Sequence, residues 1–88
     1  PLNVLSEYCI PFVKVGGYFA AYKSDNISRE ITNSDNAIKK LGGKIKEIKE
    51  IHIPGTNIIR KIVIIEKTEP TSGKYPRKAG KPSKEPLK

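Results

Sequence analysis

The residues of this sequence best suited to chemistry are the cations near its end. Residues 73–88 hold six Lys or Arg and one Glu, which gives a net charge of +5. Residues 1–72 hold eleven Lys or Arg and eight Asp or Glu, which gives a net charge of only +3. Cations neutralise phosphates, and an aromatic ring can stack on an exposed base. The segment therefore predicts contact with RNA, although basic Pro/Gly segments are also commonly just disordered. The candidate RNA-binding residues in it are Lys74, Tyr75, Arg77, Lys78 and Lys81.

Two further cations, Lys23 and Arg60, lie at the ends of apolar runs. Lys23 follows Tyr18–Tyr22, and Arg60 precedes Ile62–Ile65. Each is either an RNA contact or a solvated strand end. The other reactive side chains favour structural roles. Cys9, the single cysteine, lies among apolar residues with no histidine placed to activate it, and one histidine cannot build a metal site. We therefore expect neither a catalytic residue nor a bound metal.

The elements that position these cations follow from periodicity. Residues 60–67 and 18–23 are apolar without alternation, which is typical of strands covered on both faces. Residues 27–41 form a helix, with Asn26 as N-cap and Gly42 just past its end. One side of it is marked by residues spaced 4, 3, 4 and 3: Ile27, Ile31, Ser34, Ile38 and Leu41.

The remaining segments are an N-terminal helix, an edge strand and a tail. The helix has an apolar stripe at Leu2, Leu5, Cys9 and Phe12, and Pro11 should end or kink it near Ile10. Residues 44–53 are expected to form a half-exposed edge strand. Residues 1–70 are predicted to be an α/β domain, and residues 71–88 an extended, unpacked basic tail.

The strand order decides where Lys23 and Arg60 lie. Strands 18–23 and 44–53 should be parallel across a right-handed crossover, with strand 60–67 between them and antiparallel to both. Lys23 and Arg60 would then project from one rim of the sheet, where they could share an anion. Strand 18–23 has only one neighbour in this arrangement, so a further strand is missing beside it.

Several segments together resemble the RsmG/GidB family of 16S ribosomal RNA guanine-N7 methyltransferases. They are Leu-Ser-Glu-Tyr-Cys-Ile-Pro-Phe-Val-Lys-Val-Gly-Gly (5–17), Ala-Tyr-Lys (21–23), Leu-Gly-Gly (41–43) and Tyr-Pro-Arg-Lys-Ala-Gly-Lys-Pro-Ser-Lys-Glu-Pro-Leu (75–87). The resemblance implies the C-terminal part of a Rossmann-like class I fold, and it places Lys23 and Arg60 on basic positions beside the active site. The family's Gly-rich cofactor loop and the acidic residue after its second strand have no counterpart here.

The resemblance implies a piece of an enzyme, about the last third, that is inactive alone. S-adenosylmethionine would be the cofactor of the parent enzyme, and none is expected to bind this chain. The implied partners are 16S rRNA or the small ribosomal subunit and the missing N-terminal part, with self-association through the exposed sheet edge as a further expectation. No signal peptide or membrane-spanning run is visible, which predicts a soluble, cytoplasmic protein. The alternative is a small basic α/β module that binds RNA without catalysis.

Overall fold

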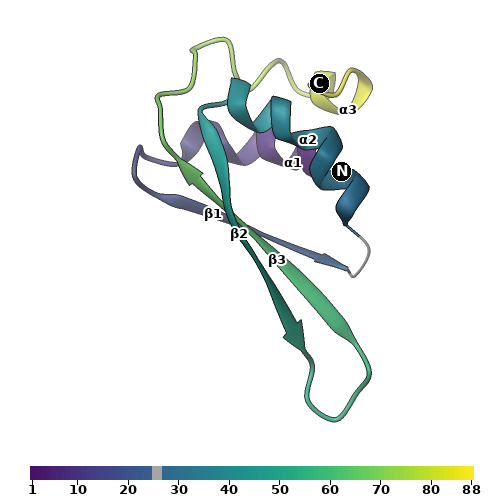
Figure 1. The fold of residues 1–88 in the computed structure, drawn as a ribbon. Coiled ribbons are helices and arrows are strands. Elements are labelled where there is room, and N and C mark those ends of the chain that lie inside the picture. The colour runs from purple at the N-terminus through teal and green to yellow at the C-terminus, as the bar shows by residue number, and fades with distance from the viewer. Residues whose placement is uncertain (25–26) are drawn as a thin grey trace.

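Three strands form the centre of this protein in a computed structural model that describes residues 1–24 and 27–88. The elements in chain order are α1 (Leu2–Cys9), η1 (Ile10–Phe12), β1 (Tyr18–Ser24), α2 (Ser28–Lys40), β2 (Gly43–His52), β3 (Ile59–Lys67) and α3 (Lys81–Lys84). The two longer helices lie together over one face of the sheet, and the last residues run back across them to α3 (Figure 1). The fold is a small α/β domain.

The sheet has the strand order expected from the sequence. It runs β1-β3-β2, and β3 is antiparallel to both neighbours. The β1–β3 register extends from Tyr18 opposite Glu66 to Ser24 opposite Arg60. A β-bulge interrupts β2 between Ile45 and Glu47, and the β2–β3 hairpin projects away from the helices (Figure 1).

The described residues cover one face of the sheet and leave the other open. Val63 and Ile65 on β3 and Ala21 on β1 are buried beneath the helices. The next residues along each strand point to the opposite face, where Tyr22 is 73% exposed and Tyr18 is also exposed. The expectation that strands 18–23 and 60–67 are covered on both faces is therefore wrong for this chain, since its two longer helices lie on the same side.

Helix α1 buries a different side from the one predicted. Leu2, Ser6 and Ile10 are buried, whereas Phe12 is 78% exposed and Leu5 is also exposed. The predicted end near Ile10 is confirmed, because α1 passes at that residue into a 3₁₀ turn containing Pro11. The buried side includes the small polar Ser6, so the spacing of large apolar residues alone indicated the wrong side.

Helix α2 ends as its sequence indicates. Ile38 and Leu41 are fully buried, and Gly42 follows with a φ of +89°. A side chain at Gly42 would collide with the backbone carbonyl of Glu69, so this turn needs glycine both for its conformation and for space. The proposed N-cap, Asn26, lies outside the described residues.

The prediction of an extended, unpacked tail at residues 71–88 is wrong. Pro82 and Leu87 are buried, Tyr75 packs against the core, and Lys81–Lys84 form a short helix. The basic composition of this segment hid its apolar anchors, which are spaced several residues apart. Among residues 1–24 and 27–88, no helix combines the length and apolar character needed to cross a membrane.

Candidate nucleic-acid interface

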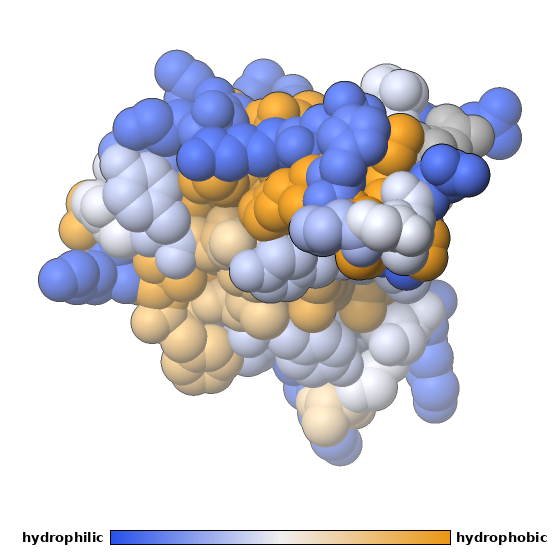
Figure 2. All heavy atoms as spheres, turned by 90° about the horizontal axis from the view of Figure 1, so that it is seen from below, coloured by the Kyte–Doolittle hydropathy of each residue, from blue (hydrophilic) through white to orange (hydrophobic). Residues whose placement is uncertain are grey.

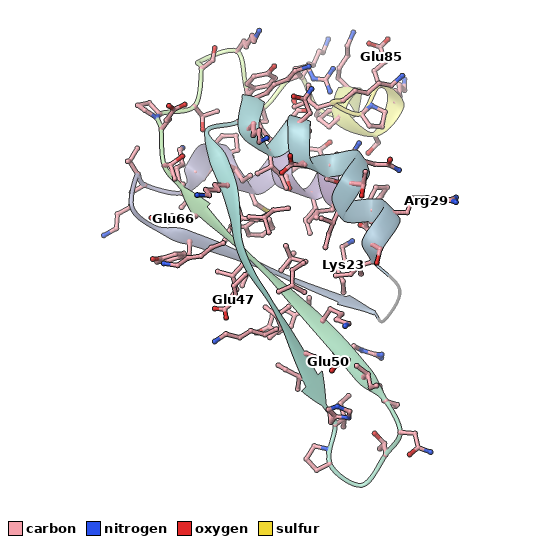
Figure 3. All side chains as sticks on the ribbon, in the orientation of Figure 1. Lys23, Arg29, Glu47, Glu50, Glu66 and Glu85 are labelled. Atoms are coloured by element: carbon pink, nitrogen blue, oxygen red, sulfur yellow. The ribbon has the colours of Figure 1, made fainter. Side chains whose placement is uncertain are left out.

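Lys23 lies at the end of β1 and is bound by a carboxylate from α2. Its Nζ atom is 2.7 Å from Oε1 of Glu30, and only 19% of the Lys23 side chain is exposed. Figure 3 shows Lys23 between the sheet and the first turn of α2. Burial alone would raise the pKa of Glu30, but the hydrogen bond and charge of Lys23, with the Leu2 backbone N–H, outweigh it and lower that pKa. The ion pair therefore ties the rim of the sheet to both helices.

Arg60 shares this end of the sheet with Lys23 but not its face. Lys23 is directly opposite Lys61 on β3, and Arg60 is opposite Ser24. Successive residues of a strand point to opposite faces, so Lys23 and Lys61 lie on the helix-covered face and Arg60 on the open one. The predicted neighbourhood of the two strands is confirmed, but the register places Lys61, not Arg60, beside Lys23. Binding of RNA by Lys23 or Arg60 stays a prediction.

The charged residue that sequence reasoning missed at this rim is Lys61. Its Nζ atom lies 3.3 Å from Oε1 of Glu50 on β2, so the two neighbouring lysines, Lys23 and Lys61, are flanked by one carboxylate on each side. Like charges opposite each other are unfavourable, and the two carboxylates offset this repulsion. Counting residues by two from Lys67 would have found Lys61 on the covered face, because Lys67, Ile65 and Val63 share it.

The tail, residues 71–88, is held to α1 by one ion pair. Arg77 donates four hydrogen bonds to the Glu7 carboxylate: from its backbone N–H at 2.8 Å, from Nε at 2.9 and 3.2 Å, and from Nη2 at 2.8 Å. The Glu7 side chain is 0% exposed. Hydrogen bonds from Arg77 hold the pKa of Glu7 below its ordinary value, against the opposing effect of burial. Sequence reasoning missed Glu7, because an acid inside an amphipathic helix has no distinctive signal.

Further contacts fix the rest of the tail. The Thr71 hydroxyl donates to the Leu41 carbonyl at 2.6 Å, and Asn3 Nδ2 donates to the Leu87 carbonyl at 2.9 Å. Arg77 Nη2 also donates to the carbonyl of Glu85. The tail is thus attached to the helices at both of its ends as well as at Glu7.

The candidate RNA-binding residues of the tail fall into two groups. Arg77 is engaged with Glu7, and Tyr75 packs against the core with Lys74 Nζ 5.3 Å from its ring centre. Lys74, Lys78 and Lys81 are exposed. The lysines therefore have access to a phosphate, although Lys81 Nζ also lies 3.2 Å from the Glu85 carboxylate, whereas Arg77 and Tyr75 have structural partners.

The open face of the sheet carries a mixed aromatic and basic surface. Lys46, at the β-bulge, donates to the Tyr18 hydroxyl at 3.0 Å and lies 5.0 Å from the centre of its ring. That hydrogen bond raises the pKa of Lys46. In Figure 2, apolar residues lie among hydrophilic ones on the face seen from below. An isolated apolar residue on a surface is ordinary, but several together mark a site of contact.

The described residues do not fit a cofactor or metal site. Both glycine pairs bind strand backbone: Gly16 N–H donates to the Lys67 carbonyl at 2.7 Å, and the Gly42 carbonyl accepts from Thr68 N–H at 2.9 Å. Neither pair opens a helix, as a cofactor-binding glycine loop does. Among residues 1–24 and 27–88 there is no metal-binding cluster of His, Cys, Asp and Glu. Burial raises the pKa of the Cys9 thiol, which disfavours a nucleophilic thiolate.

The fold and this rim define a small α/β domain with basic residues at one sheet end and along the tail. No family model matches the chain. It is similar to "Ribosomal RNA small subunit methyltransferase G" of Alkaliphilus metalliredigens, with 56% identity over 87 residues, or 99% of this chain and 36% of the relative. The proteins of the same name from Acetivibrio thermocellus and Clostridium tetani are 54% and 48% identical over 98% and 99% of the chain. The resemblance to this methyltransferase is confirmed, and the chain spans about a third of the length of these relatives.

Proposed function

We propose that residues 1–88 are the C-terminal part of an S-adenosylmethionine-dependent 16S rRNA guanine-N7 methyltransferase. The observation that carries this proposal is the 56% identity over 99% of the chain to a protein named as a ribosomal RNA small subunit methyltransferase. Residues 1–70 would complete the α/β domain of that enzyme, and residues 71–88 would be its basic tail. Its substrate, 16S rRNA in the small ribosomal subunit, would place it in the cytoplasm.

The uncovered surfaces of the sheet support this reading. Within residues 1–24 and 27–88, β1 pairs with β3 alone, and Tyr18 and Tyr22 are exposed on the open face. In a larger domain, another strand would pair with the free edge of β1, and further helices would cover that face. We propose that the N-terminal part of the enzyme supplies both, together with the cofactor site. Without that part, the same edge would promote self-association of the chain.

The methyl transfer proposed for the whole enzyme requires no strong base from residues 1–88. N7 of guanine is itself a nucleophile, so methyl transfer needs positioning and charge balance more than a strong base. Lys23, Arg60 and the tail lysines would supply positive charge to the RNA phosphates. The contribution of this chain is thus to hold RNA, while the chain alone neither binds S-adenosylmethionine nor transfers a methyl group.

A chimera tests the proposal. The segment of the Alkaliphilus metalliredigens protein that matches residues 1–88 is replaced by this chain, and the chimera is incubated with small ribosomal subunits and labelled S-adenosylmethionine. Labelled methyl at N7 of a guanine in 16S rRNA is the expected result. A folded chimera that binds the cofactor but leaves the RNA unmethylated contradicts the proposal.

The alternative, an RNA-binding module without catalysis, is favoured by one observation, the exposed lysines of the tail. Calorimetric titration of the 88-residue chain with S-adenosylmethionine and an RNA hairpin does not separate the two readings, because both predict RNA binding alone. The chimera does separate them, since a module without an enzymatic role cannot restore methylation.

A further inference from the structure

The docked tail presents two kinds of residue to opposite sides. Its buried or half-buried positions are Thr71, Tyr75, Pro76, Arg77, Pro82, Pro86 and Leu87. Its exposed cations are Lys74, Lys78, Lys81, Lys84 and Lys88. The two groups alternate along the chain, so docking the first group turns the second toward solvent. A segment with the composition of a flexible polycation is thereby held in one conformation.

The fixed point of this arrangement is Glu7. It is 0% exposed and receives every hydrogen bond that joins Arg77 to α1. The bond from the Arg77 backbone N–H fixes the course of the main chain, and the paired bonds from Nε and Nη2 fix the guanidinium plane. Lys74 and Lys78 flank Arg77 in sequence, so Glu7 determines where both of these cations leave the surface.

We propose that Glu7 is a positioning residue for RNA binding, which holds the tail so that Lys74, Lys78, Lys81 and Lys84 form a preformed ridge for the phosphate backbone of RNA. Glu7 touches no RNA itself. Binding to a fixed ridge avoids the entropy cost of ordering a flexible segment. The inference rests on the proposed function, because it takes RNA as the partner of the tail.

If the tail were a flexible polycation, one substitution would be expected to change RNA affinity in the opposite direction. Glu7→Gln raises the net charge of the chain from +8 to +9. If only the number of charges matters, RNA binding becomes tighter. If Glu7 positions the ridge, binding becomes weaker although the protein is more positive. Whether Glu7→Gln tightens or weakens RNA binding therefore distinguishes a flexible polycation from a ridge positioned by Glu7.

The experiment measures the affinity of the full chain for a fluorescent RNA hairpin by anisotropy, at several salt concentrations. We expect Glu7→Gln to weaken binding about fivefold or more, because each ordered lysine lost adds an ordering cost. Glu47→Gln is the matched control, since Glu47 is exposed on β2, has its Oε1 atom 3.9 Å from Lys49 Nζ, and its loss adds the same charge. It should leave binding unchanged or slightly tighter. Glu7→Asp keeps the carboxylate and should restore part of the loss.

A second variant keeps the test decisive if Glu7→Gln disturbs the fold. Leu87→Ala removes a buried anchor at the far end of the tail without changing any charge. It should also weaken RNA binding, and tail amides should exchange hydrogen faster in both variants while those of β3 stay protected. Unchanged or tighter binding in folded Glu7→Gln and Leu87→Ala chains overturns the inference.

A triple variant distinguishes failure of the positioning role of Glu7 from failure of the RNA contact that the proposed function assigns to the tail. The triple variant Lys74→Gln, Lys78→Gln and Lys84→Gln removes exposed charge and leaves the anchors in place. If it weakens RNA binding while Glu7→Gln and Leu87→Ala do not, the tail binds RNA as a flexible polycation and only the positioning role fails. If the triple variant binds as tightly as the unaltered chain, the RNA contact proposed for the tail fails as well.

Discussion

Lys23 and Lys61 lie directly opposite each other across β1 and β3, and each is paired with its own carboxylate, Glu30 or Glu50. Arg60, one residue earlier on β3, lies on the other face of the sheet. The basic residues of the rim are therefore divided between two faces, and those on the covered face are balanced by carboxylates. This relationship changes what is expected of the basic residues, because Lys23 and Arg60 do not form a single pair of cations around one phosphate.

We expect Lys23→Gln and Arg60→Gln each to lower methylation by the chimera about tenfold, because a charge-assisted hydrogen bond contributes roughly 1.5–3 kcal/mol. Arg60→Gln should change stability by about 1 kcal/mol or less, because Arg60 is exposed, whereas Lys23→Gln should cost more, because it leaves the largely buried Glu30 carboxylate without its partner. Initial rates and thermal unfolding measure the two effects.

The double variant tests the separation of the two sites. Because Lys23 and Arg60 lie on opposite faces, their effects on the activation free energy should add to within about 0.5 kcal/mol. A markedly smaller loss in the double variant than the sum would show that both residues serve one shared anion after all. Lys49→Gln, an exposed change on the edge strand β2, is the control for a general loss of charge.

The Glu7–Arg77 pair predicts a specific loss of stability in acid. The pKa of Glu7 is lowered in the folded chain from its ordinary value of 4.5. Its contribution is therefore fully present above pH 4.5 and is lost as the pH falls through the folded-state value. Glu7→Gln removes this contribution at every pH, so its unfolding temperature should depend less on pH below 4.5. Thermal unfolding followed by circular dichroism between neutral and acid pH measures this; parallel curves for both proteins contradict it.

The sequence was most informative where one short-range rule decides the structure. The spacing from Ile27 to Leu41 and the glycine at 42 predicted α2, and the uninterrupted apolar run at Ile62–Ile65 predicted the central strand. The side buried by α1 could not be predicted, because Glu7 on that side is buried by its contacts with Arg77. Those contacts join residues up to 70 positions apart. Local periodicity contains no information about them.

The candidate site also has one feature that the sequence predicted and others that it did not. That Lys23 and Arg60 share one end of the sheet follows from strand order, which the sequence indicated. Which face each occupies depends on the β1–β3 register, and a shift of one residue would reverse it. The docking of the tail was missed because it depends on single anchors, such as Leu87, whose partners come from the other end of the chain.

The one-sided cover of the sheet predicts unequal costs for two neighbouring isoleucines. Ile65 is 1% exposed under the helices, whereas Ile64 faces the open side. Ile65→Ala should destabilise the chain by about 2–5 kcal/mol. Ile64→Ala should cost less than half as much, since its side chain already has water on one side. Chemical denaturation of both variants gives the comparison. Equal costs would mean that something covers the open face of the isolated chain, such as a second copy.

Two glycines with positive φ provide a matched pair for the turn that ends α2. Gly42 has a φ of +89° and lies against the Glu69 carbonyl, whereas Gly55 has a φ of +76° with open space around its Cα. Alanine at either position should lower the free energy of unfolding by about 1–2 kcal/mol, because a side chain disfavours the left-handed conformation. Only at position 42 does the new methyl group also collide with backbone, so the connection from β3 to the tail must move. Gly42→Ala should therefore cost clearly more than Gly55→Ala in denaturant unfolding, and it should also weaken RNA binding by displacing the tail. If both variants lose the same stability, the close approach of Glu69 to α2 is not maintained in solution.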